Sequence, residues 1–192
     1  MSSTFLLDSN IVSFFLQARA EKELAAASQR VPLAIVDEVR RELEAHPNRG
    51  GKAFVAWLAG SNIEIRLIRL GSEAAATFAQ LLRPGDPHKD RGERASIALA
   101  TSEPALVLVT HDKNALWIAI REIWRGSARL LGIAPFVRML FDERVLADPD
   151  IADEVIRLSG PLEQRPTWWA SWRAALGSPS PSAPAAPAST PP

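Results

Sequence analysis

Short apolar stretches alternate with helix-like stretches along this chain, and this alternation constrains the fold more than any other feature. Thr4–Leu7 and Ala105–Val109 resemble strands that are buried on both faces, and a helix-like segment follows each of them. This order is typical of an α/β domain with a largely parallel sheet. We therefore expect a three-layer α/β/α fold around a central, mainly parallel sheet of about four or five strands.

The remaining elements are predicted from apolar spacing and turn residues. In 62–70, Ile63, Ile65 and Leu67 alternate with charges, and Ile68 and Leu70 then change phase, which favours a bulge or burial on both faces. A short strand is expected at 128–133. Helices are expected at 10–17, 21–28, 35–46, 51–59, 72–83, 93–102, 114–125 and 134–146.

Three regions differ in composition. We expect one domain over 1–146, a C-terminal helical extension over 147–176 packed on or beside it, and a flexible tail over 177–192. The tail holds six of the 15 prolines and no charged side chain. The extension carries Trp168, Trp169 and Trp172 near one helical face. Packing on the domain is the simplest role for them, with a partner surface or an RNA-stacking platform as alternatives.

Composition excludes several classes. With no cysteine, the chain has neither disulfides nor thiolate metal ligands. No apolar run approaches the roughly 20 residues that span a bilayer, so we expect a cytoplasmic protein without a membrane partner. Lys plus Arg and Asp plus Glu both total 22, so any polyanion must be bound by a local patch rather than a global positive field.

Two carboxylates end apolar strands. Asp8 follows the first strand and Asp112 follows the run ALVLVTH, so both belong at the carboxyl edge of a parallel sheet, where such sheets bind ligands. The structural alternative is that each acid caps the helix that follows it. Asn10 is the better candidate for capping the first helix.

Two further acids are candidates. Glu38 lies beside the apolar positions of its helix, with Glu42 one turn beyond, whereas a solvated face accounts for Asp37. Glu93 begins a helix with the spacing of a capping box from Asp90, and the glycine between them leaves room for close backbone approach. Together with the two strand acids they form an oxygen-only set suited to Mg²⁺ or Mn²⁺.

Four segments, in order, resemble the motifs of the PIN-domain nucleases: FLLDSNIV, VPLAIVDEV, GERASIALA and LVLVTHDKNAL, spanning roughly 4–141. The resemblance implies that catalysis and metal binding belong to four acids, with two polar companions that orient them. Asp90 is an alternative to the third acid, and Glu42 to the second. The acids are Asp8, Glu38, Glu93 and Asp112, and the companions are Asn10 and Thr110.

The resemblance further implies a Mg²⁺- or Mn²⁺-dependent endoribonuclease that hydrolyses RNA phosphodiesters with a metal-activated water. Many relatives of this kind are toxins of toxin–antitoxin pairs, so an antitoxin partner and a homodimer are further expectations. The alternatives are a catalytically silent RNA- or protein-binding module and a hydrolase of small phosphoesters. Basic side chains in the loops beside the acids are candidates for holding the substrate backbone: His88, Lys89, Arg91, Arg94, His111 and Lys113.

Overall fold

The structure is a computed structural model. It describes residues 3–46, 51–82, 85–86, 89–112, 115, 118–119, 129–160, 171 and 174.

The core of the fold is a five-stranded sheet in the order β3-β2-β1-β4-β5, with every neighbouring pair parallel. This confirms the predicted α/β class with a central parallel sheet. The strands are β1 (Thr4–Leu7), β2 (Leu33–Val36), β3 (Glu64–Arg66), β4 (Leu106–Val109) and β5 (Leu130–Leu131).

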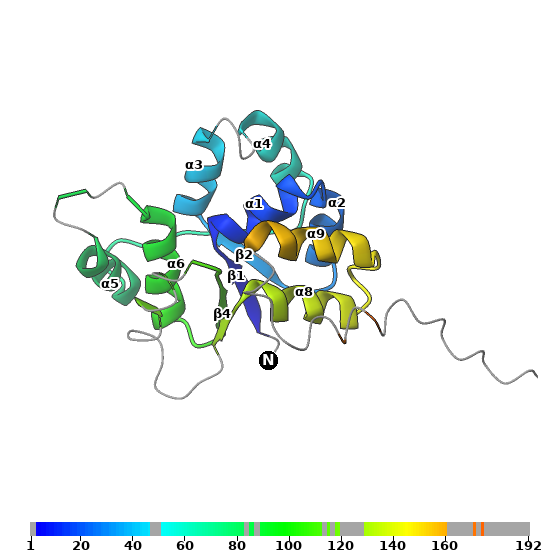
Figure 1. Cartoon of the computed structure of the whole chain (residues 1–192). Coiled ribbons are helices and arrows are strands. Elements are labelled where there is room, and N and C mark those ends of the chain that lie inside the picture. The colour runs from blue at the N-terminus through cyan, green and yellow to red at the C-terminus, as the bar shows by residue number, and fades with distance from the viewer. Residues whose placement is uncertain are drawn as a thin grey trace, which may run out of the picture.

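Helices cover both faces of the sheet and complete the three layers. Figure 1 shows α5 and α6 on one side, α1, α2, α8 and α9 on the other, and α3 and α4 above the sheet. Their bounds are α1 (Ser9–Gln17), α2 (Glu21–Ser28), α3 (Asp37–Ala45), α4 (Gly51–Ala59), α5 (Glu73–Leu81), α6 (Arg91–Ser102), α8 (Ile133–Asp142) and α9 (Pro149–Ser159).

Apolar packing between β1, α1 and α8 stabilises one face of the sheet. The ring of Phe136 on α8 lies 5.9 Å from that of Phe5 and 6.4 Å from that of Phe15. Leu6 and Leu7 have no exposed surface. Fully burying a side chain of this size contributes about 1.5–3 kcal/mol, so this core holds the end of β1 rigidly in place.

The second block of the chain differs from the sequence prediction. Ile35 and Val36 belong to β2 and not to a helix, and α3 begins at Asp37. All four residues of β2 are buried between two strands, so tertiary pairing decides the conformation of this short run. The spacing of Ile35, Val39 and Leu43 fits a helix equally well, and this explains the error.

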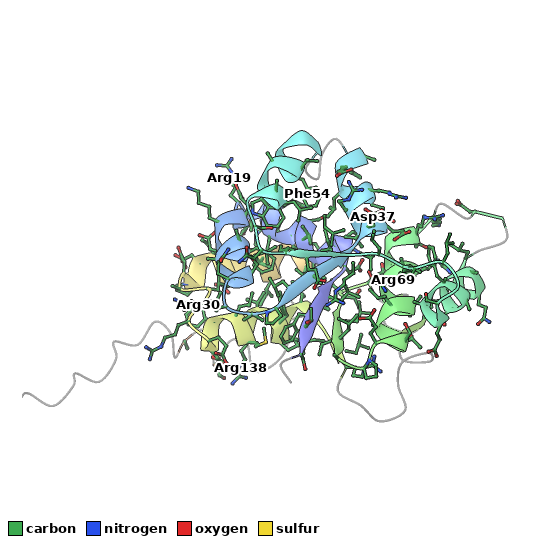
Figure 2. The ribbon with its side chains drawn as sticks, turned by 180° about the vertical axis from the view of Figure 1, so that it is seen from behind. Arg19, Arg30, Asp37, Phe54, Arg69 and Arg138 are labelled. Carbon is green, nitrogen blue, oxygen red and sulfur yellow. The ribbon has the colours of Figure 1, made fainter. Side chains whose placement is uncertain are left out.

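The predicted strand at 62–70 is also shorter than expected. Only Glu64–Arg66 is strand, and Leu67 and Leu70 are 65% and 100% exposed, so the expectation of burial on both faces is wrong here. β3 lies at the edge of the sheet, where only one side is paired. In Figure 2 the segment crosses the molecule towards Arg69 and α5.

Two predicted helix caps differ from those observed. Asp8, not Asn10, is the N-cap of α1. Asp90 precedes α6 in a left-handed conformation, with φ of 53°, and makes no side-chain capping bond, so the capping box with Glu93 does not form. The Asp90 carboxylate lies 3.7 Å from the guanidinium of Arg94 instead.

The C-terminal part of the described chain packs on the domain. α9 lies against α1 and α8. Trp168, Trp169, Trp172, the tail and most of the predicted helix at 114–125 lie outside the described residues. Within the part of the chain that the structure describes, no helix has the length and apolar character needed to cross a bilayer.

Candidate active site

Asp8 lies at the carboxyl end of β1 and is 1% exposed. Its Oδ1 accepts a 2.7 Å hydrogen bond from the backbone N–H of Ser9, and its Oδ2 accepts a 2.9 Å bond from the Thr110 hydroxyl. The backbone N–H of Asp8 donates to the carbonyl of Val109 at 3.0 Å. Groups that follow the neighbouring strands β1 and β4 therefore fix both oxygens of this carboxylate.

Asp112 follows the neighbouring strand and has two roles. Its Oδ1 accepts a 3.1 Å hydrogen bond from the backbone N–H of Ala115, as a residue that caps a helix does. Its negative charge also raises the pKa of both Asp8 and Glu93. The helix-capping contact expected for Asp112 is therefore present. The charge of Asp112 also acts on Asp8 and Glu93 at the sheet edge.

Glu93 lies in the first turn of α6 and is 9% exposed. Its Oε1 is buried without a hydrogen-bond partner. The pKa of Glu93 is raised to about 8, first by burial and then by the charges of Asp8, Asp112 and Asp90 in that order, while Arg94 opposes the rise. A buried carboxyl oxygen without a partner is unfavourable unless a proton or a cation compensates it.

The pKa of Asp8 is raised for related reasons. This pKa is about 6, because the rise caused by burial and by the charges of Glu42 and Asp112 outweighs the lowering by the hydrogen bonds from Thr110 and Ser9. The charge of Asp112 thus acts on Asp8 and on Glu93, and the charge of Asp8 acts on Glu93. Their mutual repulsion is the electrostatic condition that a bound cation would relieve.

Glu42 contacts the start of α6 directly. Its Oε1 accepts a 2.7 Å hydrogen bond from the backbone N–H of Gly92. A Cβ at Gly92 would lie 2.6 Å from Glu42 Oε2 and 2.9 Å from Cγ2 of Val39, so only glycine permits this approach. The carboxylate also complements the positive end of α6.

Glu38 and Asp37 are placed differently. Glu38 Oε1 lies 4.0 Å from the guanidinium of Arg91, and its Oε2 is buried without a hydrogen bond. Asp37, labelled in Figure 2, is buried against expectation, and Arg40 and Arg41 neutralise it at 2.7 and 2.6 Å. Of the acids on α3, Glu42 is the one whose charge acts on Asp8.

The basic candidates separate into two kinds. Arg91 is 37% exposed, stands 5.2 Å over the ring of Phe78 and borders the acids through Glu38. Arg94 is 4% exposed, donates to the carbonyl of Leu81 and lies 3.7 Å from Asp90, so it joins α5 to α6 instead of facing solvent.

The two lysine candidates are Lys89 and Lys113. Lys89 is exposed, and its backbone N–H bonds Asp86. Lys113 lies outside the described residues, as does His88. Asn10 is the second residue of α1, two residues after Asp8.

An aromatic pair lies next to the acids, and one of its two members, Phe14, was not predicted from the sequence. The rings of Phe14 and His111 meet edge to face with centroids 5.8 Å apart, and both side chains are partly exposed. Phe14 is one turn beyond Asn10 on α1, and His111 immediately precedes Asp112. The i, i+4 spacing from Asn10 was the available signal. Such rings are able to stack on an unpaired base.

The donor chemistry fits a hard divalent cation. The side chains at this edge offer carboxylate oxygens, and two of the buried ones, Glu93 Oε1 and Glu38 Oε2, have no hydrogen-bond partner. In the described ranges no three His, Asp or Glu side chains converge as the ligands of one ion do. Asp8 and Asp112 are close enough to Glu93 to raise its pKa, and holding one ion would require the side chains of Glu93 and Asp112 to turn towards the fixed oxygens of Asp8.

Comparisons with protein-family models, with curated proteins and with solved structures returned no match.

Proposed function

We propose that this chain is a metal-dependent endoribonuclease that binds Mg²⁺ or Mn²⁺ through Asp8, Glu93 and Asp112, with Glu42 as the fourth acid in preference to Glu38. The observation that carries the proposal is the unpartnered, buried Oε1 of Glu93 at an edge where Asp8 and Asp112 repel it. A buried carboxylate oxygen without a hydrogen-bond partner is costly near other negative charges, and cation binding would offset that cost.

The acidic residues would have different roles in binding the cation. The two fixed oxygens of Asp8 provide a rigid ligand, because Thr110 and Ser9 hold them. Glu93 and Asp112 contribute charge from the helix start and from the neighbouring strand. When bound, the cation supplies neutralisation of the scissile phosphate and activation of the attacking water.

Substrate contacts would come from the rim of the site. Arg91 is partly exposed beside the acids and is able to pair with a backbone phosphate once it separates from Glu38. The exposed Lys89 extends the same side. Phe14 and His111 offer a surface for an unpaired base, which favours single-stranded over double-stranded RNA.

The decisive experiment compares the wild type with Asp8→Asn and Asp112→Asn on single-stranded RNA, structured RNA and small phosphoesters, with Mg²⁺, Mn²⁺ or chelator. Asn keeps an acceptor oxygen for Ser9 or Ala115 while removing the charge. Glu154→Gln changes an exposed acid on α9 and is the matched control. We expect RNA cleavage that needs the metal, falls at least about 100-fold in both Asn variants and persists in the control.

Three outcomes would oppose the proposal. Cleavage that survives the chelator or both Asn substitutions would remove the metal–carboxylate mechanism. Turnover of small phosphoesters alone would favour a phosphohydrolase. Tight RNA or protein binding with no cleavage would favour the silent binding module.

The role of a toxin is a narrower proposal within the same function. It requires that expression arrests growth through RNA cleavage and that a partner protein blocks the site. Growth arrest that is equal for wild type and Asp8→Asn would rule it out, even if the purified chain cleaves RNA.

A further inference from the structure

β3 forms an unpaired edge with exposed apolar side chains. Within the described part of the chain, only β2 pairs with it. Ile65 is 42% exposed and Leu67 65%, and Leu70 has its whole surface in solvent. A short segment that combines free strand hydrogen bonds with apolar side chains is a candidate surface for another strand.

The two charged side chains of β3 lie symmetrically on either side of Ile65. Glu64 and Arg66 flank Ile65 and lie on the same face of the strand, with 2.9 Å between the Arg66 Nε and the Glu64 Oε1. The two side chains keep 54% and 32% of their surface exposed. A hollow of about 590 Å³, lined in part by Leu99 and Glu103 of the α6 end, keeps this face open.

A second copy of β3 would place an opposite charge beside each charged side chain of the strand. In an antiparallel pair centred on Ile65, Glu64 of each copy lies opposite Arg66 of the other, and Leu67 lies opposite Ile63. Centring the pair on Glu64 or on Arg66 would place like charges opposite one another. A slip of one residue would set Ile65 against a charge. The sequence of the strand therefore selects one register for self-association.

We propose that the chain forms a two-fold symmetric dimer through β3, in antiparallel register about Ile65, which joins the two sheets into one. Self-complementary charges identify the partner as a second copy, because a two-fold interface uses the same patch on both subunits. The strands of the two copies run in opposite directions, so the two candidate active sites open at opposite ends. The proposal is independent of the nuclease activity.

Charge exchange tests the register. Glu64→Arg and Arg66→Glu each place like charges across the interface, so each should raise the dimer dissociation constant at least about tenfold. The double variant Glu64→Arg/Arg66→Glu restores opposite charges and should dimerise like the wild type. A mixture of the two single variants should form a heterodimer. Sedimentation gives the association state, and circular dichroism verifies the fold of each variant.

Cross-linking provides a second test, since the chain has no cysteine. Ile65→Cys would face its own copy with Cα atoms about 4.5–5.5 Å apart, within the range of a disulfide. We expect rapid oxidation to a covalent dimer. Val55→Cys, at the similarly exposed Val55 on α4, is the control and should cross-link at least about tenfold more slowly.

Any of three results would overturn the proposal. A wild type that stays monomeric up to about 1 mM would show that Glu64 and Arg66 only protect a short edge from pairing. A wild-type dimer that is unaffected by both single charge changes, or equal cross-linking at positions 55 and 65, would place the interface elsewhere.

Discussion

The Thr110 hydroxyl donates a 2.9 Å hydrogen bond to Oδ2 of Asp8, linking side chains that are 102 positions apart in the chain. The contact exists because β1 and β4 are neighbours, with Leu7 opposite Val109, so the residues that follow them meet at the sheet edge. The bond lowers the pKa of Asp8 and opposes the effect of burial.

Thr110→Val should destabilise the folded protein by about 1–2 kcal/mol at pH 8, where Asp8 is ionised, because an acceptor oxygen is left buried without its donor. Thr110→Ser keeps the hydroxyl and should cost much less. Urea unfolding at pH 8 and at pH 5 measures both. An equal loss in the Ser and Val variants would assign the effect to packing of the methyl group and not to the hydrogen bond.

Gly92→Ala should destabilise the protein by about 1–3 kcal/mol, because the new Cβ would meet Glu42 Oε2 at 2.6 Å. Shortening Glu42 in the double variant Glu42→Ala/Gly92→Ala should recover part of the loss, with contact to Val39 limiting the recovery. Gly60→Ala is the control, since its nearest neighbour lies at 3.6 Å. Additive effects in this double-mutant cycle would contradict the contact.

The stability of the metal-free protein should fall as pH rises. The pKa of Glu93 is raised from 4.5 to about 8 and that of Asp8 from 3.8 to about 6, so the folded state keeps protons that the unfolded state releases. The loss begins near pH 4 and is complete above about pH 8. Glu93→Gln should be about 2 kcal/mol more stable than the wild type at pH 9 and equal to it near pH 4.

Denaturant titrations across this pH range, with and without Mg²⁺, measure the effect. Under the proposed function, Mg²⁺ should stabilise the wild type at high pH and leave Glu93→Gln unchanged, because ligands must be deprotonated to bind. A wild type whose stability rises between pH 5 and pH 8 would contradict the raised pKa values.

Glu42→Gln and Glu38→Gln distinguish the two acids of α3. We expect at least a 100-fold loss of metal-dependent RNA cleavage for Glu42→Gln and less than about fivefold for Glu38→Gln, since Glu42 acts on Asp8 while Glu38 faces Arg91. Steady-state rates at saturating metal, with unfolding curves for both variants, provide the comparison. The reverse order would return the second ligand to Glu38.

Arg91→Ala should mainly affect RNA binding, whereas Arg94→Ala should mainly affect folding stability. Losing the partly exposed Arg91 should weaken RNA binding and reduce its salt dependence, with a stability change below about 1 kcal/mol. Losing the buried Arg94 leaves the Leu81 carbonyl and Asp90 without their partner and should cost about 2–4 kcal/mol. RNA binding at two salt concentrations and thermal unfolding separate the two effects.

The local sequence pattern was sufficient to predict the structure where a single strand determines it. FLL and LVLV predict buried strands, and a carboxylate placed after each must reach the carboxyl edge once the strands are parallel. The same reasoning failed at Ile35 and Val36, where a helical spacing of apolar residues concealed β2. Burial between two strands outweighed local periodicity there.

By itself the sequence determined the α/β class and the position of Asp8 and Asp112, because strand period and apolar runs are local properties. Only the tertiary structure decided that Glu42 rather than Glu38 acts on Asp8, that Arg94 is buried and that the β3 edge is exposed. Each depends on which helix packs against which, and on the close approach of α3 and α6 at Gly92. Contacts between distant segments carry no signal in the spacing of residues along one chain.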